Sequence, residues 1–81
     1  MKVLRFTASW CGPCKALAKT LEEVETNIPI DVIDVDERTD LALEYGIRSV
    51  PTMIMLDSNN QVVKKMTGTK PQTELREWLN G

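Results

Sequence analysis

The stretch at residues 10–15 reads WCGPCK and holds the only two cysteines of the chain, Cys11 and Cys14. It follows an apolar run and stands where a helical pattern begins. Two thiols at this spacing can close into a small disulfide ring and reopen, and a helix N-terminus favours the thiolate that such exchange needs. The stretch therefore predicts thiol–disulfide chemistry at the start of a helix.

The length of 81 residues predicts a single domain, residues 1–81, near the size at which a hydrophobic core is only just sufficient. A disulfide between Cys11 and Cys14 closes too small a loop to stabilise such a domain, because the constraint on the unfolded chain grows with loop length. Two cysteines are also too few for a disulfide-framework secreted protein. These limits favour a chemical role for the pair over the alternative, two inert apolar residues.

Composition excludes several classes of function. The net charge is -2 and the basic residues are scattered, a pattern that offers no footprint for nucleic acid. No apolar run reaches membrane-spanning length, and the N-terminal apolar run is too short for a signal peptide and is interrupted by Arg5. We therefore expect a cytoplasmic protein that binds neither nucleic acid nor membrane.

The chain contains no histidine. This excludes cysteine–histidine catalysis and removes the commonest metal ligand. A structural zinc takes four protein ligands, whereas one C-x-x-C pair supplies only two of them. We expect no metal site, with a zinc shared across a dimer as the alternative.

Apolar periodicity predicts an α/β domain with the element order β-α-β-α-β-β-α. Strands are expected over residues 2–8, 30–35, 53–56 and 61–67, with the hairpin turn of the last two at residues 57–60. Helices are expected from Gly12 toward Asn27 with an apolar stripe reaching Val24, from Thr39 as N-cap to residue 46, and from residue 69 or 70 with Pro71 in the first turn. The first strand–helix–strand unit implies two parallel strands.

Two motifs carry a family resemblance. WCGPCK after a strand, followed by IRSVPT at residues 47–52, resembles the thioredoxin family, and the likeness runs through nearly the whole chain. The resemblance implies a thioredoxin-like fold with a four-stranded mixed sheet and three helices. It also implies that the N-terminal strand and helix of full-length thioredoxins are lacking, which leaves a core close in size to a glutaredoxin.

The cysteine pair and the residues between them receive distinct roles. Cys11 is the candidate nucleophile, which forms a mixed disulfide with the substrate, and Cys14, one turn inside the helix, then resolves it. Pro13 pre-sets the geometry of the pair by fixing its own φ, and by family analogy Gly12-Pro13 marks a reducing member. The alternative for Gly12 and Pro13 is ordinary helix-start chemistry.

Four further residues are expected to contact the substrate. Trp10 precedes the nucleophile and offers a flat apolar surface to partner proteins, unless it only covers the start of the helix. The resemblance implies a cis peptide bond between Val50 and Pro51, in a loop that faces the dithiol, and backbone pairing of Val50 with the substrate chain. It also assigns Gly68 to the substrate site.

Arg5 departs from the family pattern. Thioredoxins carry a buried aspartate at this position, which assists proton loss from the second cysteine, and Thr7 likewise replaces a tryptophan. We expect Arg5 either to lie in solvent or to pair with a carboxylate on or beside the adjacent strand. The candidate carboxylates are Asp31, Asp34 and Asp36. A guanidinium close to the dithiol favours the thiolates and makes the couple more oxidising.

These features predict a monomeric protein-disulfide reductase that works through Cys11 and Cys14 without a bound cofactor. By family analogy, its electron donor is a thioredoxin reductase, an NADPH-dependent flavoprotein. One alternative is a glutaredoxin-like enzyme reduced by glutathione, against which count the Gly-Pro between the cysteines and the lack of a Gly-Gly-Cys-Asp type segment near Gly68. The other alternative is a binding subunit that uses the fold and not its thiols.

Overall fold

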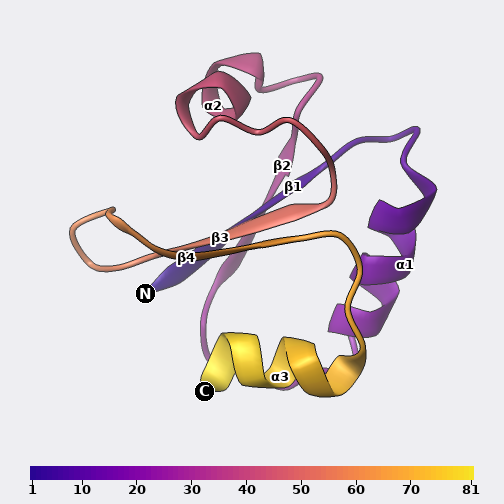
Figure 1. Ribbon diagram of the computed structural model, residues 1–81, viewed down its shortest axis with the longest axis vertical. Helices are drawn as coiled ribbons and strands as arrows, with labels where there is room; N and C mark the ends of the chain where they lie inside the picture. The colour runs from indigo at the N-terminus through magenta and orange to yellow at the C-terminus, as the bar shows by residue number, and fades with distance from the viewer.

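The computed structural model describes residues 1–81 and contains four strands and three helices in the predicted order (Figure 1). The strands are β1 (Lys2–Thr7), β2 (Ile30–Asp34), β3 (Thr52–Leu56) and β4 (Val62–Thr67). The helices are α1 (Gly12–Leu21), α2 (Thr39–Glu44) and α3 (Gln72–Asn80). None of the three helices has the length and apolar character needed to span a bilayer.

The four strands form one mixed sheet in the order β2-β1-β3-β4. β1 and β2 are parallel, with Arg5 opposite Val32, as a strand–helix–strand unit requires. β3 runs antiparallel to both β1 and β4, and all five of its residues are buried. The carboxyl ends of β1 and β2 therefore meet at one edge of the sheet, which is where the loop carrying the cysteines begins.

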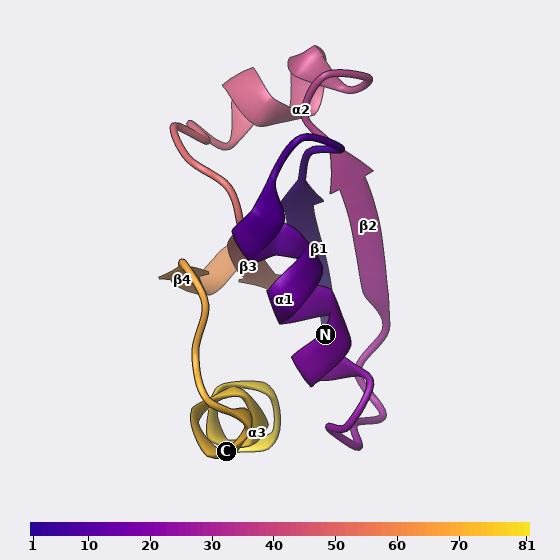
Figure 2. The same cartoon turned by 90° about the vertical axis from the view of Figure 1, so that its right-hand side faces the viewer.

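The alternation of side chains along β1 divides the core into two layers. Val3 faces α1 and α3 and belongs to a cluster with Leu17 and Leu75. Leu4 and Phe6 face the other side, where the Phe6 ring packs at a tilt against Tyr45, just after α2. Figure 2 accordingly shows α1 in front of β1, with α2 standing apart from α1 and α3. The sheet is thus covered on both faces, and α1 packs over β1 through the cluster that contains Val3 and Leu17.

Three helix boundaries differ from the predicted ones. α1 ends at Leu21. Val24 lies in the turn that follows but is still buried in the core, so the apolar pattern predicted its burial and not the end of the helix. The N-cap of α2 is Arg38 rather than Thr39, and no side chain caps that helix. Pro71 is the N-cap of α3, with an extended ψ of 156°, rather than a residue of the first turn. None of these shifts moves the residues of the candidate site.

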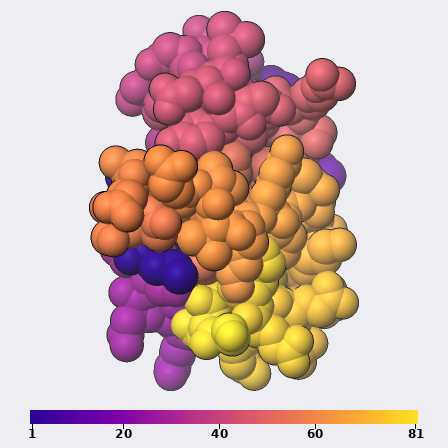
Figure 3. Space-filling model, turned by 60° about the vertical axis from the view of Figure 1, so that its left-hand side comes forward, coloured from indigo at the N-terminus to yellow at the C-terminus, as the bar shows by residue number.

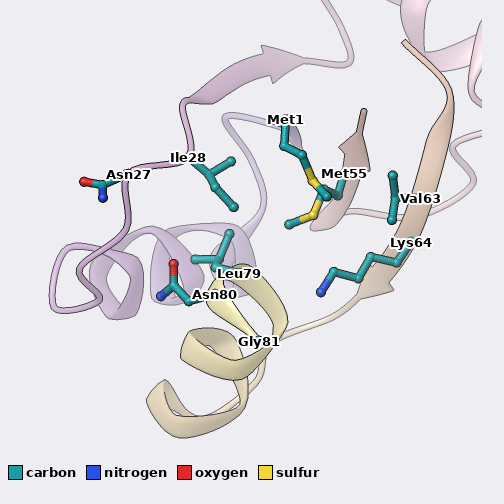
Figure 4. Close-up of a pocket in the computed structure, with 9 residues that line it drawn as sticks. All are labelled: Met1, Asn27, Ile28, Met55, Val63, Lys64, Leu79, Asn80 and Gly81. Atoms are coloured by element: carbon teal, nitrogen blue, oxygen red, sulfur yellow. The ribbon is translucent and has the colours of Figure 1, made fainter. Parts of the chain in front are cut away.

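The largest cavity lies at the opposite end of the sheet from the cysteines and has a volume of about 500 Å³. Figure 3 shows the N-terminus (indigo) in the angle between the β3–β4 hairpin (orange) and α3 (yellow). Figure 4 shows the side chains of Met1, Met55 and Leu79 pointing toward one another across this cavity. Its lining is mostly apolar, and it contains no cysteine.

Candidate active site

A disulfide joins Cys11 and Cys14 at the N-terminus of α1. Cys11 is the N-cap residue, and the backbone N–H of Cys14 donates to the Cys11 Sγ at 3.1 Å. Sulfur thus fills the capping role that an oxygen usually fills. Gly12 and Pro13 are the first two helical residues, where the missing N–H of proline leaves no hydrogen bond unmade. In the reduced protein, the same N–H and the positive end of the helix dipole stabilise an anion at Cys11.

The two cysteines occupy an apolar cluster of their own. Cys11 is 3% exposed and Cys14 is 1% exposed, and both pack with Ala8 at the end of β1. Val35 and Val50 pack against this cluster from the loops that follow β2 and precede β3. Because the surroundings are apolar, the charge of a thiolate here is balanced mainly by the helix N-terminus.

The loop before β3 lies against the cysteine pair. The peptide bond between Val50 and Pro51 is cis, and the Val50 carbonyl oxygen lies 3.7 Å from the Cys11 Sγ. The Thr52 hydroxyl donates to the Ser49 carbonyl at 2.8 Å, and the Gly68 N–H donates to the Pro51 carbonyl at 2.9 Å. Gly68 has a φ of 78°, a conformation that a residue with a side chain rarely adopts. The loop is therefore fixed from within and from the end of β4.

Trp10 lies on the surface beside the pair, with 69% of its area exposed. The ring is therefore open to solvent, and contact with a partner protein stays a prediction. Its indole Nε1–H donates to the Asp36 Oδ2 at 2.9 Å. No motif in the sequence indicates this role of Asp36. The only available signal was its place just after β2, since β1 and β2 are parallel and end at the same edge.

A groove of about 130 Å³ opens between Trp10 and the loop at residues 47–50. Its lining residues are Trp10, Val35, Ile47, Arg48, Ser49 and Val50. Val50 connects the groove to the reactive pair, because its carbonyl oxygen also contacts the Cys11 sulfur. The groove is smaller than the roughly 300–1,000 Å³ of small-molecule sites, which suits a segment of a protein partner better than a whole ligand.

Of the two alternatives for Arg5, an ion pair or a position in solvent, the ion pair is wrong. Arg5 forms no ion pair, and the single ion pair of the structure lies elsewhere. The candidate carboxylates are engaged or turned away: the Asp34 Oδ1 accepts from the backbone N–H groups of residues 36 and 37, and Asp36 accepts from the indole. Asp31 is exposed and, like Arg5, forms no side-chain hydrogen bond. Of the three carboxylates, one is therefore taken by local backbone donors, one by the Trp10 indole, and one lies free in solvent.

Arg5 instead lies half-buried between Val32 and Met53, on the face of the sheet that α1 covers. Val32 is 58% exposed because β2 is an edge strand, so one side of Arg5 reaches solvent. Burial without a partner lowers the pKa of the Arg5 guanidinium. No hydrogen bond joins Arg5 to either cysteine, and the position contains no carboxylate to receive a proton from Cys14.

Metal-ligating side chains do not gather at the pair or elsewhere. No group of three or more histidine, cysteine, aspartate or glutamate residues is placed to hold a metal ion. The chemistry that the pair offers with its own atoms is exchange of the Cys11–Cys14 disulfide with an external thiol or disulfide.

Comparison with known proteins identifies the family. The thioredoxin family model matches residues 1–81, the whole chain. The chain belongs to the thioredoxin family. It is 42% identical over 79 residues to the thioredoxin of Bacillus subtilis, an alignment that covers 93% of this chain and 75% of that thioredoxin. It is 41% identical over 81 residues to the mitochondrial thioredoxin of Bos taurus, of which it spans about half, 48%.

Solved thioredoxin structures share the fold. The crystal structure of thioredoxin from Malassezia sympodialis superposes with a TM-score of 0.84 at 33% sequence identity, covering 95% of this chain and 70% of that one. This confirms the predicted four-stranded, three-helix thioredoxin-like fold. Membership of the thioredoxin family, together with the cysteine pair, makes the chain a thiol–disulfide oxidoreductase with protein-disulfide reductase activity.

Proposed function

We propose that this thioredoxin accepts electrons from a thioredoxin reductase, an NADPH-dependent flavoprotein, and delivers them to protein disulfides in the cytoplasm, acting as a monomer. The observation that carries the proposal is the Cys11–Cys14 disulfide at the N-terminus of α1, next to a groove open to solvent. No bound cofactor is needed, because the pair itself holds the two electrons that each cycle transfers.

The cycle consists of two exchanges. The Cys11 thiolate attacks one sulfur of the substrate disulfide, so that a mixed disulfide forms and the first substrate thiol leaves. The Cys14 thiolate then attacks the Cys11 sulfur, which closes the internal disulfide and releases the second substrate thiol. The substrate gains two electrons and two protons, and the donor returns both to the protein. Support for Cys11 as the nucleophile comes from its N-cap position, beside the groove lining.

Gly12 and Pro13 pre-set the couple toward reduction of substrates. Support comes from their position as the first two residues of α1, where the fixed φ of proline limits the conformations open to the dithiol. The Gly-Pro pair also favours a thioredoxin reductase over glutathione as the donor, by analogy with the reducing members of the family.

We assign the surface for the substrate chain to Trp10 and Val50, supported by Gly68 and by Pro51, whose side chain is buried. Trp10 contributes an exposed aromatic face, and Val50 offers its backbone for pairing beside the Cys11 sulfur. Pro51 and Gly68 support this loop through the hydrogen bond between them rather than through side chains of their own.

Reduction of insulin disulfides tests the proposal and its donor. With NADPH and a thioredoxin reductase, we expect insulin to precipitate as its chains separate and NADPH to be consumed in proportion. With glutathione, glutathione reductase and NADPH, we expect no turnover above background. Turnover only with glutathione would contradict the proposed donor and support the glutaredoxin-like alternative. Absence of insulin reduction in both arms, and with dithiothreitol as donor, contradicts the reductase function.

A further inference from the structure

The groove beside Cys11 contains one charged side chain, that of Arg48. The rest of the lining is apolar except for Ser49. Arg48 is exposed and makes no hydrogen bond or ion pair; the only ion pair of the structure joins Arg38 and Asp40. A guanidinium without a partner at the rim of an apolar groove is well suited to a carboxylate, which it can bind through two parallel hydrogen bonds.

Arg48 lies close enough to the Cys11 sulfur to contact a substrate that is bound there. Val50, whose carbonyl oxygen is 3.7 Å from the Cys11 Sγ, lies two residues after Arg48. Two residues of chain span at most about 7 Å. A substrate segment that places its disulfide next to Val50 therefore brings a residue one or two positions from its cysteine within reach of the Arg48 side chain.

A charge of the opposite sign lies beside the groove, on the Trp10 side and outside its lining. There, the Asp36 carboxylate is held at the Trp10 indole by the hydrogen bond of 2.9 Å. This carboxylate repels an acidic substrate residue on its own side. The charges beside the groove thus differ between its Trp10 side and its Arg48 side, and we expect an acidic substrate residue to be favoured on the Arg48 side.

We propose that Arg48 makes this thioredoxin prefer protein disulfides in which an acidic residue lies within two positions, on one side, of the attacked cysteine. The inference rests on the proposed reductase function of Cys11 and Cys14. Arg48 takes no part in the exchange itself: the same sulfur–sulfur bonds form and break, and the substrate gains the same two electrons. Its effect is on how fast the substrate docks and how long it stays.

Short peptides with one cysteine, blocked as a disulfide with 5-thio-2-nitrobenzoate, test the preference. The nitrobenzoate thiolate is a good leaving group because of its low pKa, and its colour reports the attack. Peptides carry Glu, Gln or Lys two positions before or two positions after the cysteine. With the reduced wild-type protein, we expect Glu to react about threefold to tenfold faster than Lys at one of the two positions, with Gln between them.

Two variants separate a local from a general charge effect. Arg48→Glu is expected to reverse the order of the Glu and Lys peptides at the sensitive position. Arg76→Glu, on the exposed face of α3 away from the groove, changes the net charge equally and is expected to keep the wild-type order. The wild-type preference should also shrink as salt is raised.

The outcomes are distinguishable. If no peptide reacts with the reduced protein, the reductase function itself is contradicted. If all peptides react at equal rates, or the order survives in Arg48→Glu, the reductase function stands and the role of Arg48 is overturned. A reversal in Arg76→Glu as large as in Arg48→Glu also overturns it, because the preference then follows net charge.

Discussion

The two hollows at opposite ends of the sheet differ in a way that their sizes do not predict. The far cavity has about 500 Å³ and the groove beside Cys11 about 130 Å³. In the far cavity, two of the three polar side chains are engaged: the Lys64 ammonium lies 5.3 Å from the centre of the Trp78 ring, and the Asn80 side chain donates to the Glu25 carbonyl, whereas Asn27 is exposed. In the groove, the one charged side chain is free and a reactive sulfur adjoins.

A third hollow of about 370 Å³ is lined by Lys2, Asp31 and Glu44, which have no ion-pair partner, and it adjoins no cysteine. A reactive atom beside the hollow therefore marks the functional site better than volume or free charges do. The larger hollow is a gap between packed elements near the chain termini. The smaller one lies beside the Cys11 sulfur and is lined by the free Arg48 side chain. On this view, substitutions at the cysteine end change activity with little effect on stability. Substitutions at the far end change stability with little effect on activity. The following predictions test that division.

The largest effect is expected from removing the nucleophile. Cys11→Ser should lower insulin reduction at least about a thousandfold, because both exchanges pass through its sulfur. Cys14→Ser should still attack once and stop, so that a mixed disulfide with the substrate accumulates and is visible by mass spectrometry. The opposite pattern, with trapping in Cys11→Ser, would show that the roles of the two cysteines are reversed.

The next effect is expected at the far cavity and concerns stability. Leu79 is 3% exposed, lines that cavity and belongs to the core beneath α1 and α3. Leu79→Ala should lower the free energy of unfolding by about 2–5 kcal/mol, measured by urea denaturation, because it removes buried contacts. While the variant is folded, its rate of insulin reduction should match that of the wild type.

A matched control removes the same atoms from an exposed position. Leu43 in α2 is 82% exposed, so Leu43→Ala should leave both the free energy of unfolding and the rate unchanged. Slower insulin reduction by folded Leu79→Ala, with a normal rate for Leu43→Ala, would contradict this division. It would show that packing at the far cavity affects the active site.

The sequence predicted the local features of the cysteine end and missed its long-range contacts. WCGPCK at a strand–helix junction was enough to place the pair at the start of α1, because capping and proline preferences are local. The bond between Trp10 and Asp36 joins residues 26 apart in the chain and depends on where β1 and β2 end. The missing partner of Arg5 was equally unpredictable, since backbone N–H groups competed for Asp34.

A smaller effect is expected from the exposed aromatic wall of the groove. Trp10→Ala should lower kcat/KM for insulin about tenfold, which corresponds to about 1.4 kcal/mol of lost contact with the substrate. Trp10→Phe keeps a flat ring and loses only the indole bond to Asp36. It should therefore retain most of the activity. A loss as large in Trp10→Phe as in Trp10→Ala would assign the effect to the hydrogen bond and not to the aromatic surface.

The smallest effect is expected from Arg5, which lies in the middle of β1 between the two ends of the molecule. A cation near the dithiol favours thiolates, which stabilises the reduced protein and raises its reduction potential. Arg5→Asp should therefore lower the potential, measured by equilibration with a glutathione or dithiothreitol buffer. Because Arg5 is only partly buried and solvent on its open side screens its charge, we expect about 5–20 mV, with Arg5→Gln giving about half of that shift.

Lys65→Asp is the matched control for this shift, because it makes the same change in net charge at an exposed position of the edge strand β4. It should leave the potential unchanged. An equal reduction potential in wild type, Arg5→Gln and Arg5→Asp would show that Arg5 does not influence the cysteine pair. The potential would then depend on the helix N-terminus and the groove. A higher reduction potential in Arg5→Asp would contradict the proposed stabilisation of the thiolates by the Arg5 charge. A shift confined to the Arg5 variants would show that a charge at the centre of β1 also influences the reduction potential of the cysteine pair.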